Sequence, residues 1–161
     1  MSNLLNVQPL SKVELFTDGA CIGNPGPGGW AALLQYKSQS QEAEKLIAGS
    51  EKHTTNNKME LQAVIEGLKS LKKRAQVDVY TDSQYIVNAF KQGWLDRWQN
   101  GGWKTAAREP VKNKEQWLEL LELAEFHLIH WFWVKGHAGH EQNERVDAAA
   151  RAEALLVAGR Q

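Results

Sequence analysis

Two acidic residues stand at the ends of two β-rich segments, in nearly the same local sequence. Phe16-Thr17-Asp18-Gly19 closes one segment and Tyr80-Thr81-Asp82-Ser83 closes the other. If the segments are parallel neighbouring strands, both carboxylates face one crevice, where the ligand sites of open α/β sheets lie. Carboxylates held close together repel each other unless a proton or a cation lies between them. Oxygen ligands suit Mg²⁺ or Mn²⁺ better than Zn²⁺, and the sequence has no Cys/His cluster of zinc spacing.

Each acidic candidate also has an ordinary structural explanation. Asp18 suits a turn, and Asp82 suits the N-cap of the helix predicted to follow it. Glu60 lies three residues after Asn57, which is the spacing of a capping box. Asp147 suits the first turn of a helix, where an acid complements the helix dipole. Spacing alone leaves both explanations open at all four positions.

Residues 91–114 combine positive charge with indole rings. They hold six basic residues against two acidic ones, whereas the whole chain has a formal net charge of zero. The cations and rings are Lys91, Arg97, Lys104, Arg108, Lys112 and Lys114, with Trp94, Trp98 and Trp103. Such a segment can follow a nucleic-acid backbone, with cations on phosphates and flat rings against sugars or bases. A solvated helical face with tryptophans packed inward explains the pattern equally well.

The hydrophobic pattern predicts the elements that position these residues. Apolar, β-rich runs predict strands, and apolar residues three and four apart predict helices. The predicted strands are 13–17, 30–36, 45–48, 77–81 and 128–134. The pattern predicts a helix that starts near 56 or 57, a helix over 85–90 followed by short helical pieces, and a helix over 117–124 with Asn113 and Gln116 as a cap pair. It also predicts a final helix that contains 146–150. The glycine-rich segment 23–29 is predicted to turn. An antiparallel meander followed by helix-connected strands gives one α/β domain with a mixed sheet.

The composition limits the class of protein. A chain of 161 residues suits one domain with a single core. No apolar run approaches the ~20 residues of a membrane span, and residues 1–12 do not resemble a signal peptide. Cys21 is the only cysteine, so an internal disulfide is impossible, and no neighbour in sequence activates it as a nucleophile. We therefore expect a cytoplasmic protein.

Six strings, in order along the chain, resemble type 1 ribonuclease H, and its bacterial form most closely. They are FTDGACIGNPGPGG from Phe16, TTNNKMEL from Thr54, TDSQY from Thr81, GWKT from Gly102, PVKN from Pro110, and WVKGHAGH with NERVD from Trp133 to Asp147. The resemblance implies the ribonuclease H-like α/β fold, with a five-stranded mixed sheet in the order 3-2-1-4-5 and helices on both faces. It makes 13–161 the single catalytic domain, with 1–12 as an N-terminal extension and 91–114 as a basic handle.

The resemblance also implies the catalytic group. The four acids are Asp18, Glu60, Asp82 and Asp147, holding two Mg²⁺ ions with substrate, for which Mn²⁺ can substitute. Asp18 bridges the ions, Asp147 completes one site, and Glu60 and Asp82 help to hold the other. One ion activates the attacking water and the other steadies the leaving 3′ oxygen. His137, in a Gly/His loop, is implied to assist proton transfer; an exposed loop histidine is the alternative.

The implied substrate is an RNA–DNA hybrid, whose RNA strand is cut to leave 5′-phosphate and 3′-hydroxyl ends, as in removal of RNA primers and R-loops. A 2′-hydroxyl both donates and accepts hydrogen bonds, so the RNA strand must meet paired polar groups. The resemblance assigns hybrid binding to Cys21, Asn24, Asn56, Asn57 and Gln84, and to Trp94, Trp98, Trp103, Lys104 and Lys112 in the handle. It implies a monomer with no obligate protein partner and no membrane.

The handle departs from the family pattern. Bacterial relatives concentrate Lys and Arg between its second and third tryptophans, where this chain has Gln99-Asn100-Gly101-Gly102. Fewer phosphate contacts predict weaker hybrid binding, a raised KM and a shallower salt dependence.

Three rival functions share parts of this pattern. A non-catalytic hybrid-binding module predicts the loss of at least one acid, and all four are present. A junction resolvase or transposase-type nuclease does not need Asn56, Asn57, Gln84 or the tryptophan-rich handle. A two-metal phosphatase has no use for that handle either.

Overall fold

The computed structural model describes residues 10–135 and 140–159, which form one mixed sheet and five helices. The elements in chain order are β1 (Ser11–Cys21), β2 (Gly26–Lys37), β3 (Glu42–Thr54), α1 (Asn56–Lys69), β4 (Ala75–Thr81), α2 (Gln84–Lys91), α3 (Trp94–Asn100), α4 (Lys114–Phe126), β5 (Leu128–Trp133) and α5 (Glu141–Ala158). This is the order that the hydrophobic pattern predicts.

The sheet has five strands in the order β3-β2-β1-β4-β5, as predicted. β1 pairs antiparallel with β2, and β2 with β3, because short turns connect them. β4 lies parallel to β1, and β5 parallel to β4, with helices as the connections. β1 is therefore the central strand, and the carboxyl ends of β1 and β4 meet at one edge of the sheet.

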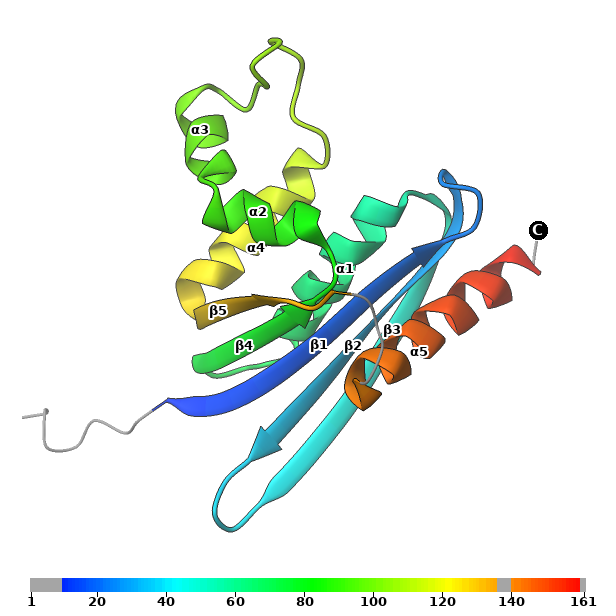
Figure 1. Ribbon diagram of the computed structural model, residues 1–161, viewed down its shortest axis with the longest axis vertical. Helices are drawn as coiled ribbons and strands as arrows, with labels where there is room; N and C mark the ends of the chain where they lie inside the picture. The colour runs from blue at the N-terminus through cyan, green and yellow to red at the C-terminus, as the bar shows by residue number, and fades with distance from the viewer. Residues whose placement is uncertain (1–9, 136–139, 160–161) are drawn as a thin grey trace, which may run out of the picture.

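Alternate residues of β1 and β2 enter two separate cores, so helices cover both faces. Leu15 and Leu34 pack with the apolar side of α1 and with Trp117 and Leu120 of α4. Phe16 and Leu33 on the other face pack with Val146 and Ala150 of α5. Figure 1 shows α5 beside β2 and β3, with α1, α2 and α4 gathered on the other side. The predicted arrangement of helices on both faces is confirmed.

The handle stands away from the sheet beyond α2 and α4 (Figure 1). Its indoles pack inward: the ring centroid of Trp98 lies 6.1 Å from that of Trp94, 6.2 Å from that of Trp103 and 5.6 Å from that of Trp117. The three handle rings are half-buried against the main core. Inward packing of the tryptophans, one of the two explanations that the sequence leaves open, therefore holds in this structure.

The strands are longer than predicted, and one predicted cap is wrong. β1 begins at Ser11, two residues before the predicted start, and β2 already begins at Gly26, inside the predicted turn. Asn113 precedes α4 with a left-handed φ of 63° and makes no capping hydrogen bond from its side chain. The Gln116 side chain instead donates to the Lys58 carbonyl of α1 at 2.9 Å. Among the described residues, no helix is long and apolar enough to cross a membrane.

Candidate active site

Asp18 and Asp82 lie at the same level of two parallel strands. The register pairs Phe16 of β1 with Tyr80 of β4, and each aspartate follows two residues later. Thr81 is the last residue of β4, so Asp82 lies just beyond the hydrogen-bonded ladder. The crevice predicted from the repeated sequence is therefore present at the carboxyl ends of β1 and β4.

Glu60 reaches the end of β1 from α1, and Gly19 makes this approach possible. The backbone N–H of Gly19 donates to Glu60 Oε1 at 3.1 Å and to Asp18 Oδ1 at 2.9 Å. A Cβ atom at position 19 would lie 2.5 Å from the backbone nitrogen of Glu60. Only glycine lets the helix and the strand come this close. One backbone N–H thus orients two carboxylates.

The three acids Asp18, Glu60 and Asp82 form a compact cluster of negative charge. One carboxylate oxygen from each lies within 4.8 Å of the others. Burial, followed by the charges of Asp18 and Asp82, raises the pKa of Glu60 well above its usual value. Glu60 Oε2 is buried and has no hydrogen-bond partner among the described residues. A hard divalent cation, which prefers carboxylate oxygens, fits this donor set.

The starts of the helices argue against the purely structural explanations of Glu60, Asp82 and Asp147. Ser83, not Asp82, caps α2, because its hydroxyl accepts the Ile86 N–H at 3.3 Å. Thr55 caps α1 and accepts the Lys58 N–H at 3.2 Å, so Asn57 and Glu60 form no capping box. Asp147 lies in the second turn of α5, which begins at Glu141.

A pocket of about 560 Å³ opens over the cluster. Its lining brings together most of the predicted site residues: Asp18, Cys21, Asn56, Asn57, Glu60, Asp82, Gln84 and Asp147. A neighbouring pocket of about 600 Å³ is lined by Asn24, Asn56, Asn57 and Lys112. The Asn56 N–H donates to Asn24 Oδ1 at 2.9 Å, which ties the turn after β1 to the start of α1. Asn56 and Asn57 line both pockets.

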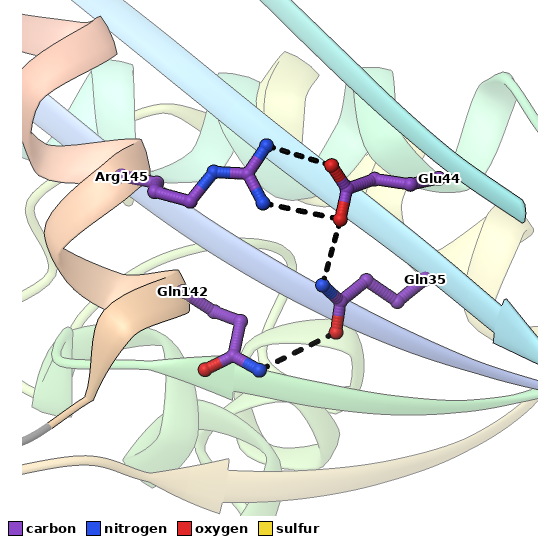
Figure 2. Close-up of polar contacts among 4 residues, drawn as sticks. All are labelled: Gln35, Glu44, Gln142 and Arg145. Atoms are coloured by element: carbon purple, nitrogen blue, oxygen red, sulfur yellow. Dashed lines mark hydrogen bonds and ion pairs between the residues drawn. The ribbon is translucent and has the colours of Figure 1, made fainter.

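A polar network fixes the N-terminal half of α5 on the strands (Figure 2). Both terminal nitrogens of Arg145 donate to the Glu44 carboxylate on β3, at 2.8 and 3.1 Å. Gln35 of β2 donates to Glu44 at 2.9 Å and accepts from Gln142 at 3.4 Å. Residues two apart on a helix point about 200° from each other. Arg145 thus faces β3 while Asp147, on the same turn, faces the pocket.

Asp147 lines the pocket but is not part of the three-acid cluster. Its carboxylate pairs with Arg151 one turn later, with Arg151 Nε 3.2 Å from both Oδ1 and Oδ2. Arg151 also lines the pocket, and its side chain is 68% exposed.

The other predicted site residues lie away from the two pockets or outside the described residues. Trp94, Trp98, Trp103 and Lys104 line neither pocket. His137 lies outside the described residues. Six residues of the lining were not predicted from the sequence as site residues: Gly19, Ala20, Ser83, Tyr85, Trp133 and Arg151. Trp133 Nε1 donates to the Asp82 carbonyl at 3.1 Å. The four-residue spacing from Asp147 was a signal that could have identified Arg151.

A 3-2-1-4-5 sheet with an acidic cluster at the ends of β1 and β4 is the arrangement of a ribonuclease H-like protein. Comparisons with known proteins agree. Residues 10–155 match the RNase H family. Ribonuclease H of Thermus thermophilus is 54% identical over 150 residues, which cover 93% of this chain and 88% of that protein. Ribonuclease H of Oleidesulfovibrio alaskensis is 53% identical over 145 residues, covering 90% and 92%.

A solved structure of an RNase H is also similar to this chain. LC9-RNase H1, described as a type 1 RNase H with the type 2 active-site motif, matches with a TM-score of 0.82 at 33% identity. The match covers 92% of this chain and 74% of that one. The chain belongs to the RNase H family, as a type 1 ribonuclease H of the bacterial kind.

Proposed function

We propose that this protein hydrolyses the RNA strand of RNA–DNA hybrids in the pocket over Asp18, Glu60 and Asp82. The observation that carries the proposal is the three-acid cluster, whose oxygens lie within 4.8 Å of one another in a family of ribonucleases. Water attacks a phosphorus of the RNA backbone, the bond to the 3′ oxygen breaks, and the products carry 5′-phosphate and 3′-hydroxyl ends. The protein acts as a monomer, without an obligate protein partner.

The cofactor in this proposal is Mg²⁺, with Mn²⁺ as a substitute. Asp18, Glu60 and Asp82 would hold one ion, and Asp147 with Asp18 would hold a second when substrate is present. When bound, the ions lower the pKa of a water and stabilise the leaving oxygen. The Gly19 N–H orients Asp18 and Glu60 through hydrogen bonds of 2.9 and 3.1 Å. His137 is our candidate for moving a proton to or from water and product.

Recognition of the RNA strand falls to the polar groups around the pocket. Asn56, Asn57 and Gln84 are exposed there and can both donate to and accept from a 2′-hydroxyl. The Cys21 thiol donates to the Thr54 carbonyl at 3.4 Å, so it helps to shape the wall of the pocket. The DNA strand then lies over the neighbouring pocket, which includes Asn24 and Lys112, and towards the handle.

The test is cleavage of labelled substrates with and without Mg²⁺. Hybrid, double-stranded DNA and double-stranded RNA are incubated separately with the full chain. We expect cleavage only of RNA in the hybrid, and only with the metal. Equal cleavage of all three substrates would overturn the proposal.

Asp18→Asn tests the mechanism, because the amide keeps the shape and removes the charge of the central ligand. We expect folded protein that does not turn over hybrid. Glu125→Gln is the matched control, since it removes one negative charge from an exposed position of α4 outside both pockets. Near-wild-type cleavage by Asp18→Asn with Mg²⁺ would contradict the mechanism.

A further inference from the structure

An arginine faces the carboxylate of Asp147. Arg151 Nε lies 3.2 Å from both carboxylate oxygens. The pair is built into α5, because residues four apart on a helix lie one above the other. The side chain of Asp147 is 23% exposed and that of Arg151 is 68% exposed. The Arg151 guanidinium can therefore leave the carboxylate and move into solvent without disturbing the core.

A divalent cation at Asp147 would need the same oxygens that now face the guanidinium. The guanidinium is always protonated and has no acceptor, so it cannot share the carboxylate by losing a proton. The two cations also repel each other at such short range. Binding of a metal ion at Asp147 therefore requires the contact with Arg151 to break or to lengthen.

We propose that Arg151 is a built-in counter-ion of Asp147, which competes with the divalent cation for this carboxylate. The inference rests on the proposed function, because it takes Asp147 as a metal ligand. Arg151 is thus a positioning residue: it holds Asp147 in the metal-free protein and sets the metal concentration at which the fourth acid becomes available.

The expected effect is moderate, because an exposed ion pair is weak. Arg151→Gln removes the competitor and should lower the Mg²⁺ concentration for half-maximal cleavage roughly two- to fivefold. Calorimetric titration with Mn²⁺ of the protein bound to a hybrid whose RNA strand resists cleavage should show tighter binding of the ion that uses Asp147, by a similar factor. Arg151→Lys keeps the charge and should stay near wild type. Lys72→Gln is the matched control, since it removes one positive charge from an exposed position between α1 and β4 that lines neither pocket.

A double-mutant cycle separates this role from a general charge effect. In the Asp147→Asn background, Arg151→Gln should no longer change the calorimetric affinity for Mn²⁺. The competition is refuted if Arg151→Gln leaves both readouts unchanged, weakens metal binding, or acts equally in the Asp147→Asn background. Hybrid cleavage by the wild type is measured beside these titrations. Failure of the wild type to cleave refutes the proposed function, whereas cleavage with unchanged metal dependence in Arg151→Gln refutes only the inference.

Discussion

At the scale of single residues, Glu60 carries an electrostatic cost in the metal-free pocket. It is only 4% exposed, and burial together with Asp18 and Asp82 raises its pKa well above the usual value. A site that binds a cation must hold such charges together before the cation arrives. The metal-free protein is therefore less stable at neutral pH than the same fold without this charge.

Glu60→Gln should consequently stabilise the metal-free protein while it impairs turnover. Because the folded-state pKa of Glu60 is raised, the stability linked to its proton is fully present below the unfolded pKa and is lost as pH rises through the folded pKa. With EDTA present, the variant should melt several degrees above wild type at about pH 8, at about 2–4 °C per kcal/mol, and the gain should shrink by about pH 4.

The same experiment with Mg²⁺ provides the control. The ion neutralises the cluster, so it should raise the melting temperature of wild type more than that of Glu60→Gln. A variant that melts below wild type at both pH values without metal would contradict the electrostatic account. The amide oxygen of the introduced glutamine can still accept the Gly19 N–H, so loss of that hydrogen bond would not explain such a result.

The positions of the acids could be predicted from the sequence better than the contacts around them. Asp18 and Asp82 could be paired from repeated strings, because parallel strands of similar sequence end at one edge. The alternative of a capping role for Asp82 could not be decided from the sequence, because Asp82 and Ser83 compete for one helix terminus and only the backbone path decides between them. The close approach of Glu60 to Gly19 spans 41 positions, so local sequence could not predict it.

At the scale of the elements, an ion pair links α5 to the edge strand β3. Hydrogen bonds from Arg145 and then Gln35 lower the pKa of Glu44 from 4.5 to about 2. The lowered pKa means that this contact stabilises the fold above the unfolded pKa and stops doing so as pH falls through about 2. Because Asp147 follows two residues later on the same helix, we expect the contact to influence the position of Asp147 as well.

Arg145→Gln should therefore affect both stability and turnover. We expect the melting temperature to fall by about 1–4 °C at neutral pH, with the difference shrinking as pH falls from about 4.5 towards 2. We expect kcat to fall by up to about tenfold, since small displacements of catalytic groups are costly, with little change in KM. Thermal melts and steady-state kinetics measure the two effects.

The charge-swapped pair, Glu44→Arg with Arg145→Glu, is the informative control. It restores attraction between the same two positions, so both the melting temperature and kcat should recover part of the loss. Equal defects in the single and swapped variants would show that the contact does not orient α5.

The elements also show where the hydrophobic pattern loses information. The helices and β4 were predicted well, because their apolar residues face a core on at least one side. β3 was predicted only as 45–48, whereas it spans Glu42–Thr54. Most of its side chains are exposed, so backbone pairing with β2 rather than burial defines its length. Arg145 and Glu44, 101 positions apart, likewise left no local signal.

At the scale of the whole molecule, the balance of charge decides how a polyanion is bound. The chain has 19 basic and 19 acidic residues, so it offers no global attraction to nucleic acid. Affinity must come from local placement, and the indoles of the handle are half-buried in packing against one another and Trp117. The exposed surface of α3 is therefore where added cations should matter most. Gln99 and Asn100 are both exposed there.

Gln99→Lys with Asn100→Lys should tighten binding of hybrid without changing the chemical step. Each new phosphate contact should steepen the dependence of log affinity on log salt by up to about 0.9, and by less on a hybrid than on B-DNA. We expect a lower KM at moderate salt with kcat largely kept, because neither position lines the acidic pocket.

Gln39→Lys with Ser40→Lys adds the same charge at the exposed β2–β3 turn, at the far end of the molecule from the handle (Figure 1). Equal gains in the two double variants would mean that net charge alone governs affinity, and no gain in the first would remove α3 from the binding surface. A gain confined to positions 99 and 100, with a steeper salt slope, would assign the DNA-strand phosphates to the handle and explain why a neutral chain can bind a polyanion.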